Sequence, residues 1–310
     1  MVKEEWFKKN GALIDGPDFV KQVRGMNVVE YEDPKIRRKY SITTDVLAFL
    51  RCSRQYGYFA VKNYVPAQAT QLYFGIVIHE VLDRAHRQYK GLMEGKSASV
   101  PTEKEIKEYF LSVTASLESR GIRPYSMKAR ETALDYLQRF NSSVGTKLYP
   151  LVKDTEHQLK VDMKDYVLHG VVDVIANGTD KLGNDILEIW DYKGSRRVEE
   201  GSREMKDYEF QMRIYAELYR QKNGKLPARA ILCFLGEGDP DLMKVEVTFD
   251  PASIKESMDV FYDTVKTIED RRQRDDWSPP RIRPSIATCA GCDIRWDCKT
   301  VEGQFKLRYP

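Results

Sequence analysis

The stretch from Gly170 to Lys193 constrains the fold of this 310-residue chain more than any other. It reads GVVDVIANGTDKLGNDILEIWDYK, two apolar runs separated by residues that favour turns. Such a pattern predicts a β-hairpin. The first strand carries Asp173 among apolar residues, and the second ends in Asp191, Tyr192 and Lys193. We therefore expect a sheet whose apolar surface is interrupted by charged residues at one end of the hairpin.

These charged residues form a candidate catalytic set. Side chains alternate along a strand, so Asp191 and Lys193 share one face while Glu188 points to the other. If the hairpin brings Asp173 alongside, two carboxylates meet, and they repel each other unless a cation such as Mg2+ or Mn2+ lies between them. Lys193 can then orient or activate a water, or steady developing negative charge, as in metal-assisted phosphodiester hydrolysis. The alternative is a strand-end ion pair with Asp173 unrelated to it.

Bulk composition is that of a globular protein, with 42% hydrophobic residues, 31% charged residues and a net charge of +3. The chain has no run of about eighteen apolar residues, and its first residues carry no apolar segment. We therefore expect a cytoplasmic protein with no membrane span. Because the net charge is small, any DNA-binding surface is expected to be a local patch. Five cysteines in such a chain favour a metal or a cluster over disulfides.

Apolar periodicity divides the chain into helices and strands. Helices are expected over residues 45–64, 73–89, 102–119, 127–148, 202–222 and 251–272, and further strands over 157–164, 228–234 and 242–249. Residues 1–40 form an N-terminal extension without an assignable function, and 95–150 reads as a helical insertion that covers a sheet.

Two of the helices carry candidate site residues. His79 follows Gly75 by one turn, and a small residue there lets another element approach the imidazole closely. The alternative for His79 is a core histidine, and His86 is expected at the surface. Gln211 and Tyr215 are four residues apart, hence on one face of their helix.

Three cysteines gather near the C-terminus, where Cys289, Cys292 and Cys298 are spaced C-x-x-C-x5-C. This triplet predicts a metal-ligand site, and Cys52 is the candidate for a fourth ligand, although a lone helical cysteine is usually a small buried hydrophobe. Four thiolates suit either tetrahedral Zn2+ or an iron-sulfur cluster. Such a site would tie the N-terminal helix to the tail at 285–300, and metal binding would contribute folding free energy.

Two groups of basic residues are candidate contacts to nucleic acid. Arg196 and Arg197, with Arg203, come just after Lys193 and are placed to hold phosphates, unless they belong to a solvated loop. A denser arginine run over 271–283 is either a contact to the DNA backbone or a solvated tail.

Together these features resemble the RecB-like branch of the PD-(D/E)XK nuclease superfamily. The resemblance is closest to its iron-sulfur members, which are CRISPR-associated adaptation exonucleases, the AddB C-terminal nuclease and helicase-linked nuclease domains. It covers about residues 41–299 and rests on the one-plus-three cysteines and four short motifs: GIVIHE at 75–80, GVVD at 170–173, DYK at 191–193 and QMRIY at 211–215. Many members have Glu where this chain has Asp191, and residues 1–40 match nothing that we can name.

The resemblance implies an α/β fold of the restriction-endonuclease-like kind. It implies a mixed central sheet flanked by helices, with a helical insertion at 95–150 and a Cys-ligated cluster joining the N- and C-terminal parts. The nuclease domain would span 41–300, with its cluster-binding tail at 285–300 and a short C-terminal tail at 301–310.

The resemblance also implies roles for individual residues. Asp173, Asp191 and Lys193 would be catalytic, and a Mg2+ or Mn2+ ion would be held by His79, Asp173, Asp191 and the carbonyl of Tyr192. Gln211 and Tyr215 would shape the site or contact DNA, with Arg196 and Arg197 as further substrate contacts. A 4Fe-4S cluster with a mainly structural role would be held by Cys52, Cys289, Cys292 and Cys298.

The function implied is a metal-dependent DNase, an exonuclease acting on single-stranded DNA or DNA ends in repair, recombination or CRISPR adaptation. A subunit that needs a helicase or CRISPR integrase partner for activity is one alternative. A catalytically silent DNA-binding scaffold and a zinc-stapled protein without nuclease activity are two others. The sequence does not distinguish endonuclease from exonuclease, nor the polarity of cleavage.

Overall fold

The computed structural model describes residues 37–64 and 70–298. The chain divides into two compact units, Met1–Arg38 and Lys39–Pro310, and nearly all described residues belong to the second. The predicted extension at 1–40 and tail at 301–310 therefore lie mostly or wholly outside the described residues. Within the described part, no helix is both long enough and apolar enough to cross a membrane.

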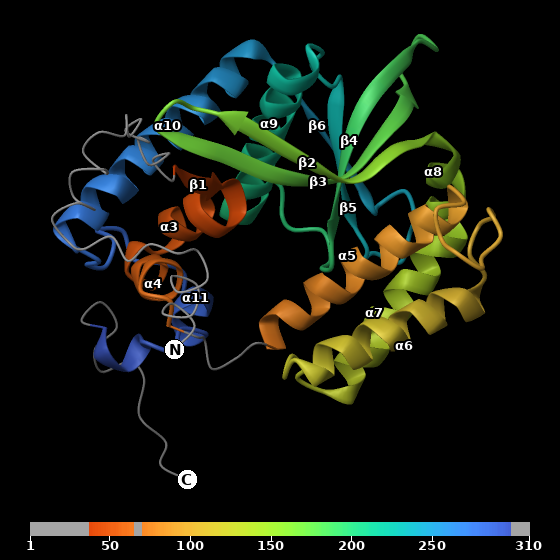
Figure 1. Cartoon of the computed structure of the whole chain (residues 1–310), viewed down its shortest axis with the longest axis horizontal. Helices are drawn as coiled ribbons and strands as arrows, with labels where there is room; N and C mark the ends of the chain where they lie inside the picture. The colour runs from red at the N-terminus through yellow and green to blue at the C-terminus, as the bar shows by residue number, and fades with distance from the viewer. Residues whose placement is uncertain (1–36, 65–69, 299–310) are drawn as a thin grey trace, which may run out of the picture. The chain divides into compact units, whose positions relative to one another are not determined.

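A six-stranded sheet forms the centre of the second unit (Figure 1), with the order β1-β3-β4-β5-β6 and with β2 also paired to β3. The β4–β5 pair is parallel, whereas β2–β3, β3–β4 and β5–β6 are antiparallel, so the expected mixed sheet is confirmed. The strands are β1 (Arg38–Ser41), β2 (Val152–Asp162), β3 (Tyr166–Thr179), β4 (Asp185–Lys193), β5 (Arg229–Phe234) and β6 (Lys244–Thr248).

Helices cover both faces of the sheet. The main ones are α5 (Thr70–Tyr89), α6 (Glu103–Ser119), α7 (Met127–Phe140), α9 (Arg203–Asn223) and α10 (Pro251–Arg274). Shorter helices and turns are η1 (Ile42–Leu47), α3 (Ala48–Arg51), α4 (Ser53–Tyr56), η2 (Gly57–Val61), η3 (Asn141–Gly145), α8 (Thr146–Leu148), η4 (Tyr149–Leu151), α11 (Ile286–Ala290) and η5 (Arg295–Asp297).

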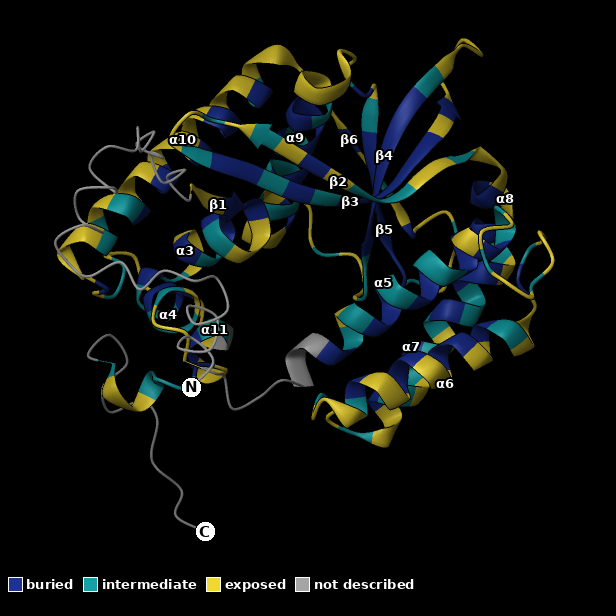
Figure 2. Ribbon diagram, in the orientation of Figure 1, coloured by how far each residue is buried: buried dark blue, intermediate teal, exposed yellow. Residues whose placement is uncertain are grey.

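Strand alternation explains why two separate apolar cores form. Leu187 and Ile189 of β4 join a core with α9 and α10, whereas Trp190 and Tyr192 join a second core with α5, α6 and α7. Both faces of β4 are therefore buried (Figure 2). The end of β4 consequently lies between α5 on one side of the sheet and α9 on the other.

The predicted hairpin is confirmed as β3 and β4. Its turn is closed by Asp180, whose Oδ1 accepts hydrogen bonds from the backbone N–H groups of Leu182 and Asn184, both at 2.8 Å. The β3–β4 ladder runs from Thr179 and Asp185 to Val174 and Trp190. Asp173 and Asp191 are the next residues of the two strands, at the point where the ladder stops.

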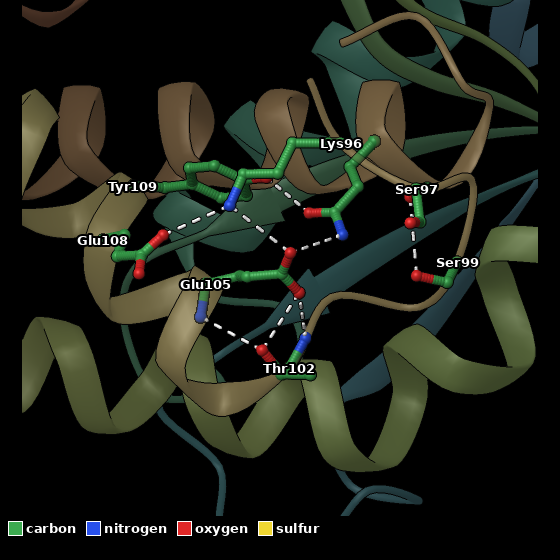
Figure 3. A network of polar contacts seen from close by, with 8 residues as sticks. Lys96, Ser97, Ser99, Thr102, Glu105, Glu108 and Tyr109 are labelled. Carbon is green, nitrogen blue, oxygen red and sulfur yellow. Dashed lines mark hydrogen bonds and ion pairs between the residues drawn. The ribbon is translucent and has the colours of Figure 1, made fainter. Parts of the chain in front are cut away.

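The capped start of α6 confirms the helix predicted from Thr102. The Thr102 hydroxyl accepts a hydrogen bond from the Glu105 N–H at 3.2 Å, while Glu105 Oε2 accepts one from the Thr102 N–H at 2.9 Å. Glu105 Oε1 also accepts from Gln88 of α5 at 3.0 Å and lies 3.4 Å from Lys96 (Figure 3). The cap thus ties α6 to α5, the helix that carries His79.

Two sequence predictions were wrong in detail. The helix expected over 45–64 is interrupted at Cys52, whose φ of −160° and ψ of 106° are extended. Just past this break Gly57 packs against the distant Trp277, so closely that a Cβ would lie 2.2 Å from its ring. His86, expected at the surface, is only 1% exposed because Tyr149 and Tyr192 from other elements close over its imidazole.

Candidate active site

Asp173 connects α5 and β4 at the end of the β3–β4 ladder. Its Oδ1 lies 3.1 Å from Nδ1 of His79 on α5. Its Oδ2 accepts a hydrogen bond of 2.6 Å from the Tyr192 N–H, which has no ladder partner on β3 at this point. A strand residue turns its N–H and C=O to the same side, so the Tyr192 carbonyl faces the same gap.

Asp191, Lys193 and Gln211 form a second group at the same place. Asp191 Oδ2 lies 2.6 Å from Lys193 Nζ, and Asp191 Oδ1 accepts a hydrogen bond of 2.9 Å from Gln211 Nε2. Gln211 Oε1 in turn accepts one of 3.2 Å from Lys193 Nζ. The Gln211 amide thus holds the carboxylate and the ammonium together. Asp191 and Gln211 are 4% and 5% exposed, so their contacts lie largely out of water.

The electrostatics of the site favour a cation. Burial raises the pKa of Asp191, although Lys193 lowers it, and the nearby Asp173 raises it further. Burial alone would lower the pKa of His79, but the carboxylates of Asp173, Asp191 and Glu156 outweigh it and raise the pKa to about 9. At that pKa His79 carries a proton at neutral pH, so the carboxylates attract positive charge from the imidazole as well as from Lys193. A metal ion held by His79 would displace that proton.

Glu156 is a site residue that the sequence reasoning missed. The β2–β3 register puts it opposite Asp173, and its backbone φ of 47° is left-handed, which is uncommon for a residue with a side chain. Among the described residues, ligand atoms of His79, Glu156 and Asp173 lie within 4.8 Å of one another. Burial and the Asp173 charge raise the pKa of Glu156 to about 7. The sequence predicted this strand only from His157 onward, whereas β2 begins at Val152, so Glu156 fell outside the predicted element.

The other predicted substrate residues occupy different environments. Tyr215 is 5% exposed and packs so tightly under Gly170 that a Cβ there would lie 2.5 Å from its ring. This contact explains the glycine in the GVVD motif, because any side chain would displace the tyrosine. Arg196 and Arg197 are exposed in the loop after β4, where the Arg197 N–H donates to Glu237 at 2.8 Å.

Two hollows open beside the charged groups. One, of about 740 Å³, is lined by His79, Glu156 and Asp173, and the other, of about 560 Å³, by Lys193, Gln211 and Tyr208. Each also has two arginines on its wall, Arg84 and Arg87 in the first and Arg51 and Arg203 in the second. The reactive groups thus lie recessed between two hollows.

The four predicted cluster cysteines line one cavity. Cys289 and Cys292 are buried, and Cys52 and Cys298 are partly exposed. Burial raises the pKa of the Cys52 and Cys292 thiols, and the neighbouring cysteines raise it further. Within the described part of the chain, no three of these sulfur atoms lie within 4.8 Å of one another. The fifth cysteine, Cys233, is buried in β5 and is not among the residues that line this cavity.

Comparison with known proteins identifies the family. The model of the PD-(D/E)XK nuclease superfamily matches residues 43–299. A solved structure from Eubacterium rectale, named "Putative exonuclease", is 12% identical with a TM-score of 0.51, over 92% of this chain and 96% of its own. A second, SSO0001, is 13% identical with a TM-score of 0.36, over 96% of both chains. No curated protein matches the chain significantly.

Proposed function

The chain belongs to the PD-(D/E)XK nuclease superfamily, and on this premise we propose that it is a metal-dependent deoxyribonuclease with exonuclease activity. The observation that carries the proposal is that Asp173 accepts the Tyr192 N–H where β3 and β4 part, and that Tyr192 stands between Asp191 and Lys193, which form an ion pair. The reaction is phosphodiester hydrolysis, in which a water oxygen bonds to phosphorus and the bond from phosphorus to a sugar oxygen breaks. The name of the Eubacterium rectale protein supports the exonuclease assignment.

The residues fit a Mg2+ or Mn2+ ion. Carboxylate and carbonyl oxygens with one imidazole are donors that these ions accept. His79, Asp173, Asp191 and the Tyr192 carbonyl would hold the ion, and Glu156 adds a further carboxylate on the His79 side. Asp191 Oδ2 is buried and contacts Lys193 Nζ at 2.6 Å, and a carboxylate oxygen with one such partner keeps a further lone pair for a ligand. When bound, the ion polarises the phosphate and lowers the pKa of a coordinated water.

The remaining tasks fall to side chains of the chain itself. Lys193 places a positive charge beside Asp191, where it can orient the attacking water or offset negative charge that develops on the phosphate. Gln211 fixes both groups through its amide. Tyr215 is buried beneath Gly170, which supports a role in shaping the site, whereas the exposed Arg196 and Arg197 are available to phosphates.

The recessed position of the site favours single-stranded DNA or DNA ends as the substrate. Only 6% of the Asp191 side chain and 14% of the Lys193 side chain are exposed. A flexible strand can follow a groove into such a site, whereas the middle of a duplex is a stiff rod that would first have to open. The arginines on the walls of both hollows offer charges to the phosphates on either side of the scissile bond. Roles in repair, recombination or CRISPR adaptation, with a helicase or integrase partner, stay predictions.

We further propose that Cys52, Cys289, Cys292 and Cys298 hold a 4Fe-4S cluster rather than zinc. Four Zn–S bonds of about 2.3 Å would hold all four sulfurs about 3.8 Å apart, whereas in the described structure no three of them lie within 4.8 Å of one another. A cubane cluster keeps its cysteines farther apart because iron and sulfide occupy the middle. The Arg54 guanidinium donates to both the carbonyl and the carboxylate of Asp297, at 2.9 and 3.0 Å, and so clamps the two halves of the cavity wall.

The test is to purify the protein without oxygen, record its visible spectrum and add Mn2+ with end-labelled single- and double-stranded DNA. The proposal predicts a brown protein that shortens single strands from an end, and a Lys193→Ala variant that does not. The exposed Lys206 on α9 provides a matched control, since Lys206→Ala should cleave normally. A folded protein that binds but never cleaves DNA would favour the scaffold alternative, and activity gained on adding a partner would favour the partner-dependent one.

A further inference from the structure

Tyr208 forms one side of the environment of Lys193. The Lys193 Nζ lies 4.2 Å from the centroid of the Tyr208 ring, well within the range of a cation–π contact. The same Nζ lies 2.6 Å from Asp191 Oδ2 and 3.2 Å from Gln211 Oε1. Two oxygens and one ring face therefore surround an ammonium on a side chain that is 14% exposed.

The ring is itself held in place before any substrate arrives. Tyr208 and Gln211 are three residues apart on α9, so one face of the helix presents both to Lys193. The Tyr208 hydroxyl donates to Glu204 Oε1 at 2.7 Å, one turn earlier on the same helix. The ring also packs against Phe234 of β5, with centroids 6.1 Å apart. The orientation of the ring is thus fixed by α9 and by the sheet.

The geometry points to Tyr208 as a positioning residue for cleavage, whose ring face holds the Lys193 ammonium against Asp191 and Gln211. This inference rests on the proposed nuclease function. A lysine ammonium sits on a flexible four-carbon stem, so its position must be set by its surroundings. The negative face of the ring supplies the attraction, whereas the hydroxyl is engaged with Glu204.

A different role for the ring would be to stack on a DNA base, because Tyr208 also lines the 560 Å³ hollow. A base would have to stack on a ring face that is turned toward Lys193, and the Tyr208 hydroxyl is engaged with Glu204. The contact with Lys193 is already formed in the protein alone. These observations favour positioning of the lysine over stacking.

The experiment compares Tyr208→Phe, Tyr208→Leu and Tyr208→Met on a single-stranded oligonucleotide with Mn2+. Loss of the ring in the Leu and Met variants should lower kcat about tenfold and leave KM within about twofold. Tyr208→Phe keeps the ring and should stay within about twofold of the wild type in both constants. Tyr219→Leu removes a partly buried tyrosine farther along α9 and is the matched control. Melting temperatures show which variants fold, and two ringless variants guard against the failure of one.

Each outcome decides between the roles. An unchanged kcat in a folded ringless variant overturns the inference, as does a raised KM with normal kcat, which is the mark of base stacking. If Tyr208→Phe is as slow as Tyr208→Leu, the hydroxyl is the active part and the ring-face inference is wrong. A folded wild-type protein that cleaves no DNA rejects the proposed function before any variant is compared, and the inference falls with it.

Discussion

Glu156 faces Asp173 across the β2–β3 ladder, with its backbone in the left-handed region at a φ of 47°. Thr155 pairs with Val174 and His157 with Val172, so this left-handed residue lies between two regular pairs of the antiparallel ladder. A left-handed conformation costs a residue with a side chain about 1 kcal/mol or more. This unfavourable conformation occurs at the residue that brings a third ligand-type side chain close to His79 and Asp173.

Replacing Glu156 with Gln should weaken Mn2+ binding by about tenfold, because the carboxylate charge beside His79 and Asp173 is lost. Isothermal titration of Mn2+ into the protein without DNA measures this directly. Glu103→Gln is the control, since it removes the same charge from an exposed side chain in the first turn of α6, which does not line the His79 hollow. Equal Mn2+ affinity in both variants and the wild type would remove Glu156 from the site.

Replacing Asp191 with Ala should reduce cleavage by at least about a thousandfold, because the change removes a proposed metal ligand and the ion-pair partner of Lys193. Binding to an oligonucleotide in Ca2+ should persist, as measured by fluorescence anisotropy. Asp185→Ala alters an exposed carboxylate at the start of the same strand and should leave cleavage intact. Substantial cleavage by the Asp191 variant would mean that the reaction is carried out elsewhere.

Replacing Cys292 with Ser should remove most of the brown absorbance and lower the melting temperature, because a cluster held from both ends of the chain contributes folding free energy. Cys233→Ala should keep the spectrum, since Cys233 is buried in β5 and is not among the residues that line the cysteine cavity. Iron and zinc analysis of both proteins measures the metal directly. A colourless wild-type protein with one zinc per chain would contradict the cluster assignment.

Acid should destabilise the protein through His86. Burial lowers the pKa of His86 to about 3, so below its unfolded value of about 6.5 the unfolded chain binds a proton that the folded chain does not. Stability from this residue is therefore present above pH 6.5 and is lost as the pH falls toward 3. Between pH 7 and pH 5 the wild type should lose about 2 kcal/mol more unfolding free energy than His86→Gln. Urea unfolding at the two pH values tests this, and parallel losses would show that His86 is protonated in the folded state.

Much of the fold could be predicted from the sequence, because several of its helices and strands are specified by residues close together in the chain. The turn residues of the β3–β4 hairpin predict it. The alternation of side chains along β4 predicts that Asp191 and Lys193 lie on one face of the sheet. The start of α6 is set by a capping box, in which Thr102 and Glu105, three residues apart, form reciprocal hydrogen bonds. Because these features depend on residues that are neighbours in the chain, periodicity and capping rules can predict them.

What the sequence missed depends on contacts between distant segments. Glu156 reaches the site through strand register and one left-handed residue, and neither has a local signature. His86 is buried by Tyr149 and Tyr192, which come from other elements, so its helix alone gave no sign of its surroundings. The helix around Cys52 breaks near the contact between Gly57 and the distant Trp277.

The two sides of the cysteine cavity are synthesised at different times, because they come from distant parts of the chain. Arg54 and Asp297, which clamp the cavity wall, are 243 positions apart in the chain. At about 5–20 residues per second, a ribosome needs roughly 12–50 s to make the stretch between them. During that time the sheet and its helices can fold, but the C-terminal cysteines that line the cavity with Cys52 have not yet been synthesised. Closure of the cavity is therefore a late step of biogenesis, and a chain terminated early would lack one wall.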